Sequence, residues 1–364
     1  MVLKVKTDDE VLLQLVKETD NGVIVENKQK EIQREIKYIL QKKKDYPPER
    51  YTVLILFHNE LPENYIFQIY EKSIDQRIGW IFPIQALLSN NHSYAKDEHF
   101  LKVAYPAFIN LISSQNIQPQ KIPDLKDEMS LEDFYLNNSI ILILDNEELK
   151  NIKEFNFEDY MPNLYQYGYF VKPNKIKLHK NVLDEFFEDV SSKKVHKRLT
   201  ISSISVNLKK DVFINQLFKE QLSDESHKII IFYLLYQIIE LLIKRVFDDQ
   251  FKKKIKVISL ENVNLFDLNK KLQEMTSEKK RIKSLLNEYS NSKSIELEEL
   301  LFEFLQIPEE EKKDYNLADL IYEVRTFLVH SYRRITNKQK ILMEDINFYF
   351  ERIIIYLLIN YKED

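Results

Sequence analysis

The sequence contains no cysteine and only three glycines, Gly22, Gly79 and Gly168, among 364 residues. Without cysteine, the chain can form no disulfide bond, no thiolate zinc site and no cysteine nucleophile. Three isolated glycines cannot form a glycine-rich phosphate loop of the P-loop or dinucleotide-binding type. ATPases, GTPases and Rossmann dehydrogenases of the usual sort are therefore excluded.

The sequence also lacks an apolar run long enough to cross a membrane. Its longest apolar stretch, from Ile229 to Ile243, is shorter than the roughly 20 residues that a bilayer needs and includes Gln237 and Glu240, so we expect a buried helix there. The N-terminal sequence MVLKVKTDDE reaches two aspartates before a hydrophobic run develops, so we expect no secretory leader. Together with the absence of cysteine, these features favour a cytoplasmic protein that does not associate with a membrane.

Neither sign of charge dominates the chain. The 53 basic and 58 acidic residues leave a net charge of −5, which argues against a general nucleic-acid coat but leaves room for local positive patches. An apolar content of 44% in 364 residues allows about two domains, each with its own core.

Apolar runs alternate with amphipathic stretches in the N-terminal part. The β-branched runs 51–57 and 139–145 have the composition of buried strands, and the stretches 63–74 and 98–115 between them have helical periodicity. This alternation predicts an α/β or α+β domain over residues 1–200 that senses or regulates.

Two further segments flank this pattern. Residues 10–44 are highly charged and mostly helical in pattern, and the dipeptide Asn21-Gly22 within them indicates a hairpin or a helix break. The tyrosine-rich segment 155–170 is more typical of packing than of a base-stacking platform. A linker is expected over 201–224, where the character of the sequence changes.

Long apolar-periodic helices follow the linker. They are expected at roughly 225–250, 265–289, 294–306, 316–333 and 338–361, with a cap for the fourth helix between Asp314 and Asn316. Five helices with short connections predict an all-α bundle over residues 225–364. The whole chain is therefore expected to be mainly α.

The segment IYEVRTFLVHSYRR at 321–334 contains Arg325 and His330, separated by four residues. It lies late in the predicted bundle, in a helix of 3.6-residue periodicity, and is followed by a final apolar helix. This pattern resembles the R-x4-6-H signature of the HEPN superfamily of RNA-cleaving domains, and the resemblance covers residues 225–364. The upstream helix FYLLYQIIELLIKR resembles the first core helix of that family, with Glu240 set among hydrophobes.

The resemblance implies cleavage of RNA without a metal or another cofactor. A histidine can take a proton from a ribose 2′-hydroxyl or give one to the leaving 5′-oxygen, and an arginine can hold the phosphate and its growing charge. The resemblance therefore assigns His330 as general base or acid and Arg325 as phosphate clamp, with a 2′,3′-cyclic phosphate as product.

Helix geometry constrains this pair, because a spacing of five residues places Arg325 and His330 about 140° apart around an ideal helix. Either the helix ends or distorts near His330, or two chains pack their fourth helices together and share one cleft. The resemblance implies the second arrangement, so a homodimer or a higher even oligomer is expected. Glu323 lies about 20° from His330 on the helical wheel and is a candidate to orient the imidazole.

Four further residues are candidates to support the site: Glu240, Thr326, Ser331 and Tyr332. Many members of the family have Asn, Asp or His directly after the arginine, and Thr326 can still form a hydrogen bond at that position. Glu240 is either a functional buried acid or the solvent-facing edge of its helix. Arg333 and Arg334, with Tyr332, either bind RNA or form a basic helix end that suits the helix dipole.

The remaining histidines are scattered, and their spacing fits no standard metal motif, so no metal site is expected. The sequence thus predicts a metal-independent endoribonuclease, which by the resemblance is a bacterial toxin or an antiviral defence effector. A regulatory ligand or a phage component is the partner expected for the N-terminal domain. The alternative is a HEPN-like dimerisation or nucleic-acid-binding module that has lost catalysis, which Thr326 and the modest net charge favour.

Overall fold

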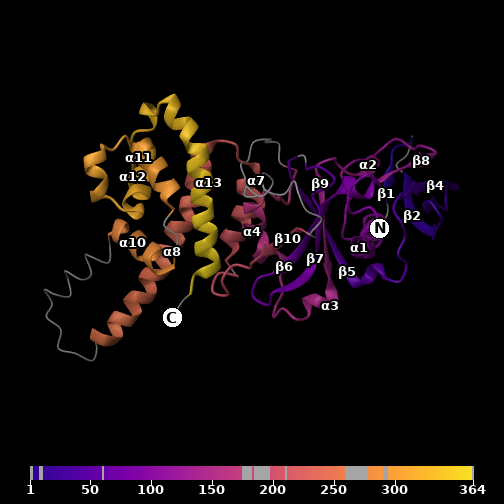
Figure 1. Ribbon diagram of the computed structural model, residues 1–364, viewed down its shortest axis with the longest axis horizontal. Helices are drawn as coiled ribbons and strands as arrows, with labels where there is room; N and C mark the ends of the chain where they lie inside the picture. The colour runs from indigo at the N-terminus through magenta and orange to yellow at the C-terminus, as the bar shows by residue number, and fades with distance from the viewer. Residues whose placement is uncertain are drawn as a thin grey trace. The chain divides into compact units, whose positions relative to one another are not determined.

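The computed structural model describes residues 3–7, 11–59, 61–173, 183, 197–209, 211–258, 277–289 and 294–362 (Figure 1). About 49% of the chain is helical and about 20% is in strands, with two sheets in the N-terminal half and helices in the C-terminal part. The order of a strand-containing part followed by a helical part is confirmed. The expectation that the whole chain is mainly α is wrong: the protein is mixed α/β, because the N-terminal half contains more strands than the sequence pattern indicated.

The described residues form two compact units. The first contains the residues up to Phe157, with 169–173 and 197–202, and the second contains Glu158–Gly168 and the residues from Ser203 onward. Most of the segment 201–224, which the sequence analysis assigned to a linker, belongs to the second unit. It includes three short helical elements: α6 (Val212–Gln216), the π-helical η4 (Leu217–Gln221) and α7 (Leu222–Asp224).

The first sheet of the first unit has the strand order β1-β2-β3-β4-β8. Its strands are β1 (Leu3–Val5), β2 (Val11–Glu18), β3 (Gly22–Asn27), β4 (Ile32–Lys37) and β8 (Glu128–Met129). The hairpin expected at Asn21-Gly22 joins β2 to β3, whereas the helical pattern expected over 10–44 is wrong. In β2, Val11 and Leu13 are buried and Leu12 between them is 43% exposed, so the side chains alternate with the period of a strand.

The second sheet has the strand order β10-β6-β7-β9-β5. Its strands are β5 (Tyr51–Phe57), β6 (Phe67–Glu71), β7 (Gln76–Pro83), β9 (Ser139–Asp145) and β10 (Lys197–Ile201). The two strands expected at 51–57 and 139–145 are confirmed, and they pair antiparallel with each other. The helical periodicity inferred over 63–74 is wrong, since this stretch contains β6, which pairs with both β7 and β10.

Helix α1 (Glu98–Ser113) confirms the helix expected at 98–115. The carboxylate of Asp97 caps its first turn by accepting a hydrogen bond from the Phe100 backbone N–H at 2.8 Å. The helix contacts β2 of the first sheet and both β5 and β9 of the second. One apolar core therefore joins the two sheets through α1. Short helical turns complete the first unit: η1 (Pro48–Arg50), η2 (Ile84–Leu87), α2 (Leu131–Phe134) and α3 (Asn146–Leu149).

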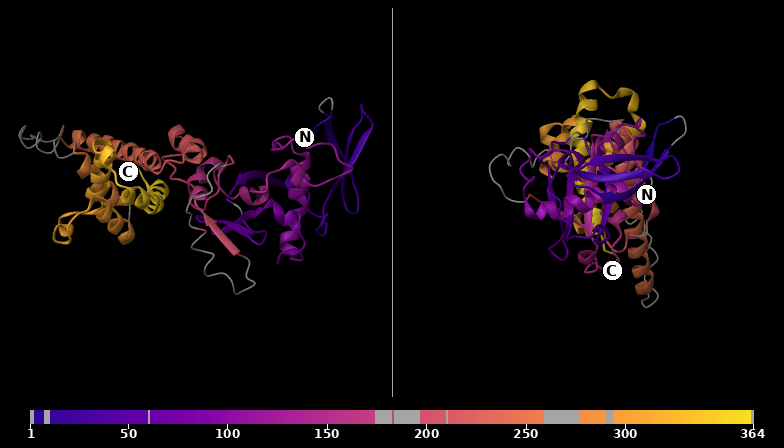
Figure 2. Two further views of the ribbon diagram at one scale, coloured as in Figure 1. Left: turned by 90° about the horizontal axis from the view of Figure 1, so that it is seen from above. Right: turned by 90° about the vertical axis from the view of Figure 1, so that its right-hand side faces the viewer.

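The second unit is helical, and Figure 2 shows its helices, coloured from salmon to yellow, gathered into one bundle. These helices are α8 (Lys228–Ile258), α10 (Glu278–Tyr289), α11 (Ile295–Leu305), α12 (Leu317–His330) and α13 (Asn337–Asn360). The shorter α4 (Met161–Gln166), which follows the turn η3 (Phe157–Tyr160), contacts α13. The five long helices agree with those expected from the sequence, except that part of the second, 265–276, lies outside the described residues. No helix in the described part of the chain is both long and apolar enough to span a bilayer.

Gly79 marks a place where two strands approach closely. A Cβ atom at this position would collide with the carbonyl oxygen of Ile143 on the neighbouring strand β9. We predict that Gly79→Ala lowers the free energy of unfolding by about 1–3 kcal/mol, because strand backbone cannot move aside as a flexible side chain can. Urea denaturation of the full chain measures this, and an unchanged midpoint would show that β9 shifts without cost.

His92 makes the stability of the first unit dependent on pH. Its side chain is 4% exposed and its Nε2 lies 3.0 Å from the Ala86 carbonyl oxygen. Burial lowers the pKa of His92 below its ordinary value of 6.5, so the unfolded chain binds a proton more readily than the folded chain. Stability is therefore lost as the pH falls below 6.5.

We predict that His92→Gln, which keeps an N–H donor but cannot be protonated, reduces this acid-induced loss. Thermal unfolding measured between pH 7.5 and pH 5 tests the prediction, with His99→Gln as control because His99 is an exposed histidine of the nearby helix α1. Equal pH profiles for wild type and His92→Gln would contradict it.

Candidate active site on helix α12

Both residues predicted to act in catalysis lie on α12. The helix begins after Asn316, whose side-chain oxygen accepts hydrogen bonds from the backbone N–H groups of Ala318 and Asp319. The Asp319 carboxylate in turn accepts one from the Asn316 N–H at 3.2 Å, which completes a capping box and confirms the predicted start of the helix. At the other end, the Ser331 N–H donates to the Phe327 carbonyl at 2.7 Å, so the helix is regular through His330.

One face of α12 is apolar and buried. Its residues, Leu320, Ile321, Val324 and Leu328, are at most 1% exposed, and the helix contacts α8, α10 and α11. This packing fixes the rotation of the helix about its own axis, and so decides in which direction each polar residue leaves it.

Arg325 is turned towards α8. Its Nη2 lies 3.4 Å from Oε1 of Glu240, and its guanidinium carbon lies 5.7 Å from the centroid of the Tyr236 ring. The Arg325 side chain is 29% exposed and that of Glu240 is 46% exposed. Glu240 therefore lies at the solvent-facing edge of its helix and is not a buried acid. It still contacts Arg325, the predicted phosphate clamp.

His330 is the last helical residue of α12, and its side chain is exposed. It makes no hydrogen bond or ion pair within the part of the chain that the structure describes. Because α12 is regular, His330 and Arg325 leave its axis about 140° apart. The helix thus ends at His330 without a prior distortion that would turn the two side chains towards each other.

Glu323 faces α10 and accepts a hydrogen bond from Lys279 Nζ at 2.9 Å. Burial alone would lower the pKa of Lys279, but the hydrogen bond to Glu323 and the nearby charge of Asp319, 3.8 Å away, raise it overall. Glu323 is therefore engaged with Lys279, and orienting the His330 imidazole would require it to leave that partner.

The other predicted supporting residues lie in different surroundings. The hydroxyl oxygen of Thr326 is buried and has no hydrogen-bond partner among the described residues. Ser331 caps the helix, while Tyr332, 51% exposed, begins the turn η6 (Tyr332–Arg334) together with the exposed Arg333 and Arg334. This turn presents two guanidinium groups and one aromatic ring to solvent next to His330.

Two residues near Arg325 were not found from the sequence. Tyr236 is 2% exposed and donates a hydrogen bond from its hydroxyl to Glu278 Oε1 of α10 at 2.8 Å. Burial, and after it the hydrogen bond to Glu278, raises the pKa of Tyr236. Tyr233 lies close enough that the charge of Arg325 opposes the rise in its pKa that burial causes. Tyr233, Tyr236 and Glu240 are spaced three and four residues apart, which places them on one side of α8. This spacing could have been found in the sequence.

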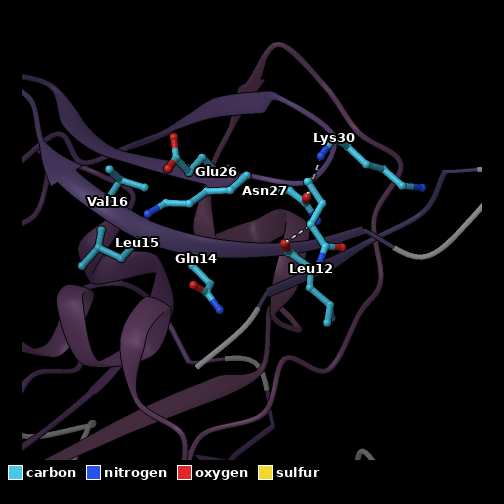
Figure 3. Close-up of a pocket in the computed structure, with 9 residues that line it drawn as sticks. Leu12, Gln14, Leu15, Val16, Glu26, Asn27 and Lys30 are labelled. Atoms are coloured by element: carbon cyan, nitrogen blue, oxygen red, sulfur yellow. Dashed lines mark hydrogen bonds between the residues drawn. The ribbon is translucent and has the colours of Figure 1, made fainter.

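The first unit has a separate groove on the outer side of its first sheet (Figure 3). Its lining includes the exposed Leu12 and Val16 and the basic Lys28. Asn27 in this groove donates to the Leu12 carbonyl at 3.1 Å and accepts from the Lys30 N–H at 3.0 Å, so its amide links β3 to β2 and closes the turn that leads to β4.

No family model, curated protein or solved structure matches this chain. The HEPN resemblance therefore rests on the residues of the C-terminal part alone. Within the described ranges, no three His, Asp or Glu side chains are grouped so that they could hold a metal ion together.

Thr326 offers a test of whether its hydroxyl has a role. A buried hydroxyl without a partner costs about 1–3 kcal/mol, so we predict that Thr326→Val keeps or raises the free energy of unfolding. Thr336 is the matched control because its hydroxyl caps α13, and Thr336→Val should lose about 1 kcal/mol. Chemical denaturation of both variants measures the difference. A loss of stability in Thr326→Val as large as in Thr336→Val would mean that the hydroxyl has a partner in solution.

Proposed function

We propose that this protein is a metal-independent endoribonuclease in which two copies of the helical unit share an active site. The observation that carries the proposal is the composition of one helix end: Arg325 and His330 both reach solvent from α12, and Tyr332, Arg333 and Arg334 follow directly. Guanidinium groups hold phosphates, aromatic rings stack on unpaired bases, and imidazole transfers protons, so this set of groups suits RNA cleavage.

In the proposed reaction, the His330 imidazole takes the proton of a ribose 2′-hydroxyl. The 2′-oxygen then attacks the adjacent phosphorus. The bond between phosphorus and the 5′-oxygen breaks, and the leaving 5′-oxygen takes a proton from a second, protonated imidazole. Arg325 compensates the charge that develops on the phosphoryl oxygens. A pair of chains supplies two His330 side chains, one as base and one as acid, and thereby avoids the angle of about 140° between Arg325 and His330 on a single helix.

The wider role follows from the HEPN resemblance. We propose a cytoplasmic toxin or antiviral defence effector in which the first unit responds to a regulatory ligand or a phage component. The open groove beside Leu12 and Lys28 is the candidate place for such a ligand. The second unit would then carry out the cleavage.

A second candidate is a HEPN-like dimerisation or nucleic-acid-binding module without catalysis. Two observations favour it: Glu240 occupies Arg325, and His330 has no hydrogen bond to the rest of the described chain that would orient its ring. In that case the exposed Arg333 and Arg334 would bind RNA without cleaving it.

We predict that the wild-type protein cleaves total tRNA or messenger RNA in EDTA and leaves 2′,3′-cyclic phosphate ends. Removal of either active group, by Arg325→Ala or His330→Ala, should lower the cleavage rate by about 100-fold or more, since proton transfer and charge stabilisation each contribute at least that much. His227→Ala is the control, because His227 is an exposed histidine of the same unit that lies before α8. Wild type and His330→Ala that are equally inert but still bind RNA would support the binding module instead.

A further inference from the structure

The ion pair between Arg325 and Glu240 differs in geometry from the pair that Arg50 forms with Asp145. Arg50 and Asp145 make three hydrogen bonds of 2.6 to 3.0 Å, and the Asp145 side chain is only 15% exposed. Arg325 and Glu240 make one contact of 3.4 Å, and Glu240 is 46% exposed. Charged hydrogen bonds of this kind are normally about 2.7–2.9 Å long. Glu240 therefore holds Arg325 weakly and in reach of other anions.

Arg325 has a second support that does not depend on Glu240. Its guanidinium lies over the ring of Tyr236, which is buried and held by its hydrogen bond to Glu278. A guanidinium over an aromatic face is attracted to it even when its N–H groups bind elsewhere. If the Glu240 carboxylate moved away, the guanidinium would keep its place on Tyr236 and would have N–H groups free for a phosphate.

We propose that Glu240 is an internal competitor for the substrate phosphate: its carboxylate occupies Arg325 in the resting chain, and RNA must displace it. This inference rests on the proposed function and adds a regulatory element to that site. An exposed ion pair opposes binding only modestly, by about three- to fivefold in affinity. Glu240 thus raises, by this modest factor, the concentration of RNA or of inorganic phosphate that is needed to occupy Arg325.

The test compares Glu240→Gln with Glu344→Gln. Glu344 is the matched control because it pairs with Lys228 of the same helix α8 and its side chain is 40% exposed, close to the 46% of Glu240. The probe is a fluorescent RNA oligonucleotide whose 2′-hydroxyls are methylated, so that it binds without being cleaved. We expect Glu240→Gln to bind it about three- to fivefold more tightly than wild type, and Glu344→Gln to bind as wild type does. In the Arg325→Ala background, which lacks the cation, the gain from Glu240→Gln should disappear.

A second measurement separates this inference from the proposed function. Modification of Arg325 by phenylglyoxal, followed by mass spectrometry, reports how available the guanidinium is, and inorganic phosphate protects it. Faster modification in Glu240→Gln, with protection at lower phosphate concentration, supports the competitor even if no variant cleaves RNA. Equal modification rates in wild type and Glu240→Gln would overturn it.

Cleavage distinguishes a competitor from a residue that positions Arg325. At RNA concentrations below saturation, a competitor predicts that Glu240→Gln cleaves about three- to fivefold faster than wild type. A slower Glu240→Gln with weaker oligonucleotide binding would overturn the inference and make Glu240 a positioning residue of the same site.

Discussion

The buried apolar face of α12 is the constraint on which the candidate site depends. Leu320, Ile321 and Val324 are fully buried, and each contributes about 1.5–3 kcal/mol that would be lost if the helix turned on its axis. The helix therefore cannot rotate without exposing these side chains, and the angle of about 140° between Arg325 and His330 would stay the same if it did. Packing places the Arg325 guanidinium against α8 and leaves the His330 imidazole in solvent. For the two groups to act on one phosphate, the α12 surfaces of two chains would have to come together.

Most of the fold could be predicted where both faces of an element are buried or where a helix has a clear apolar stripe. The strands 51–57 and 139–145 and the long helices after 225 are of this kind. The strand character of 10–44 was missed because apolar side chains, Leu12 and Val16, lie on the exposed face of β2 and hide its period of two, and because charged residues occupy one face of β4. Which strands pair depends on contacts between distant residues, and no local pattern records it.

The candidate site likewise has residues that the sequence predicts and contacts that it does not predict. Arg325 and His330 could be found from their spacing, since both lie in one short segment. The contacts of Tyr236 with Glu278, and of Glu323 with Lys279, join different helices and require the packing of α8, α10 and α12 to be known. Thr326 shows the limit most clearly, because the wheel position beside an arginine does not reveal that its hydroxyl oxygen is buried.

The few glycines have a consequence for the unfolded chain. Gly22 and Gly79 stand where a neighbouring strand leaves no room for a side chain, and the sequence has only one other glycine. A chain almost free of glycine samples fewer backbone conformations when unfolded, and so loses less entropy on folding. This stiffness helps a long, highly charged polypeptide without disulfide bonds to keep two separate cores ordered.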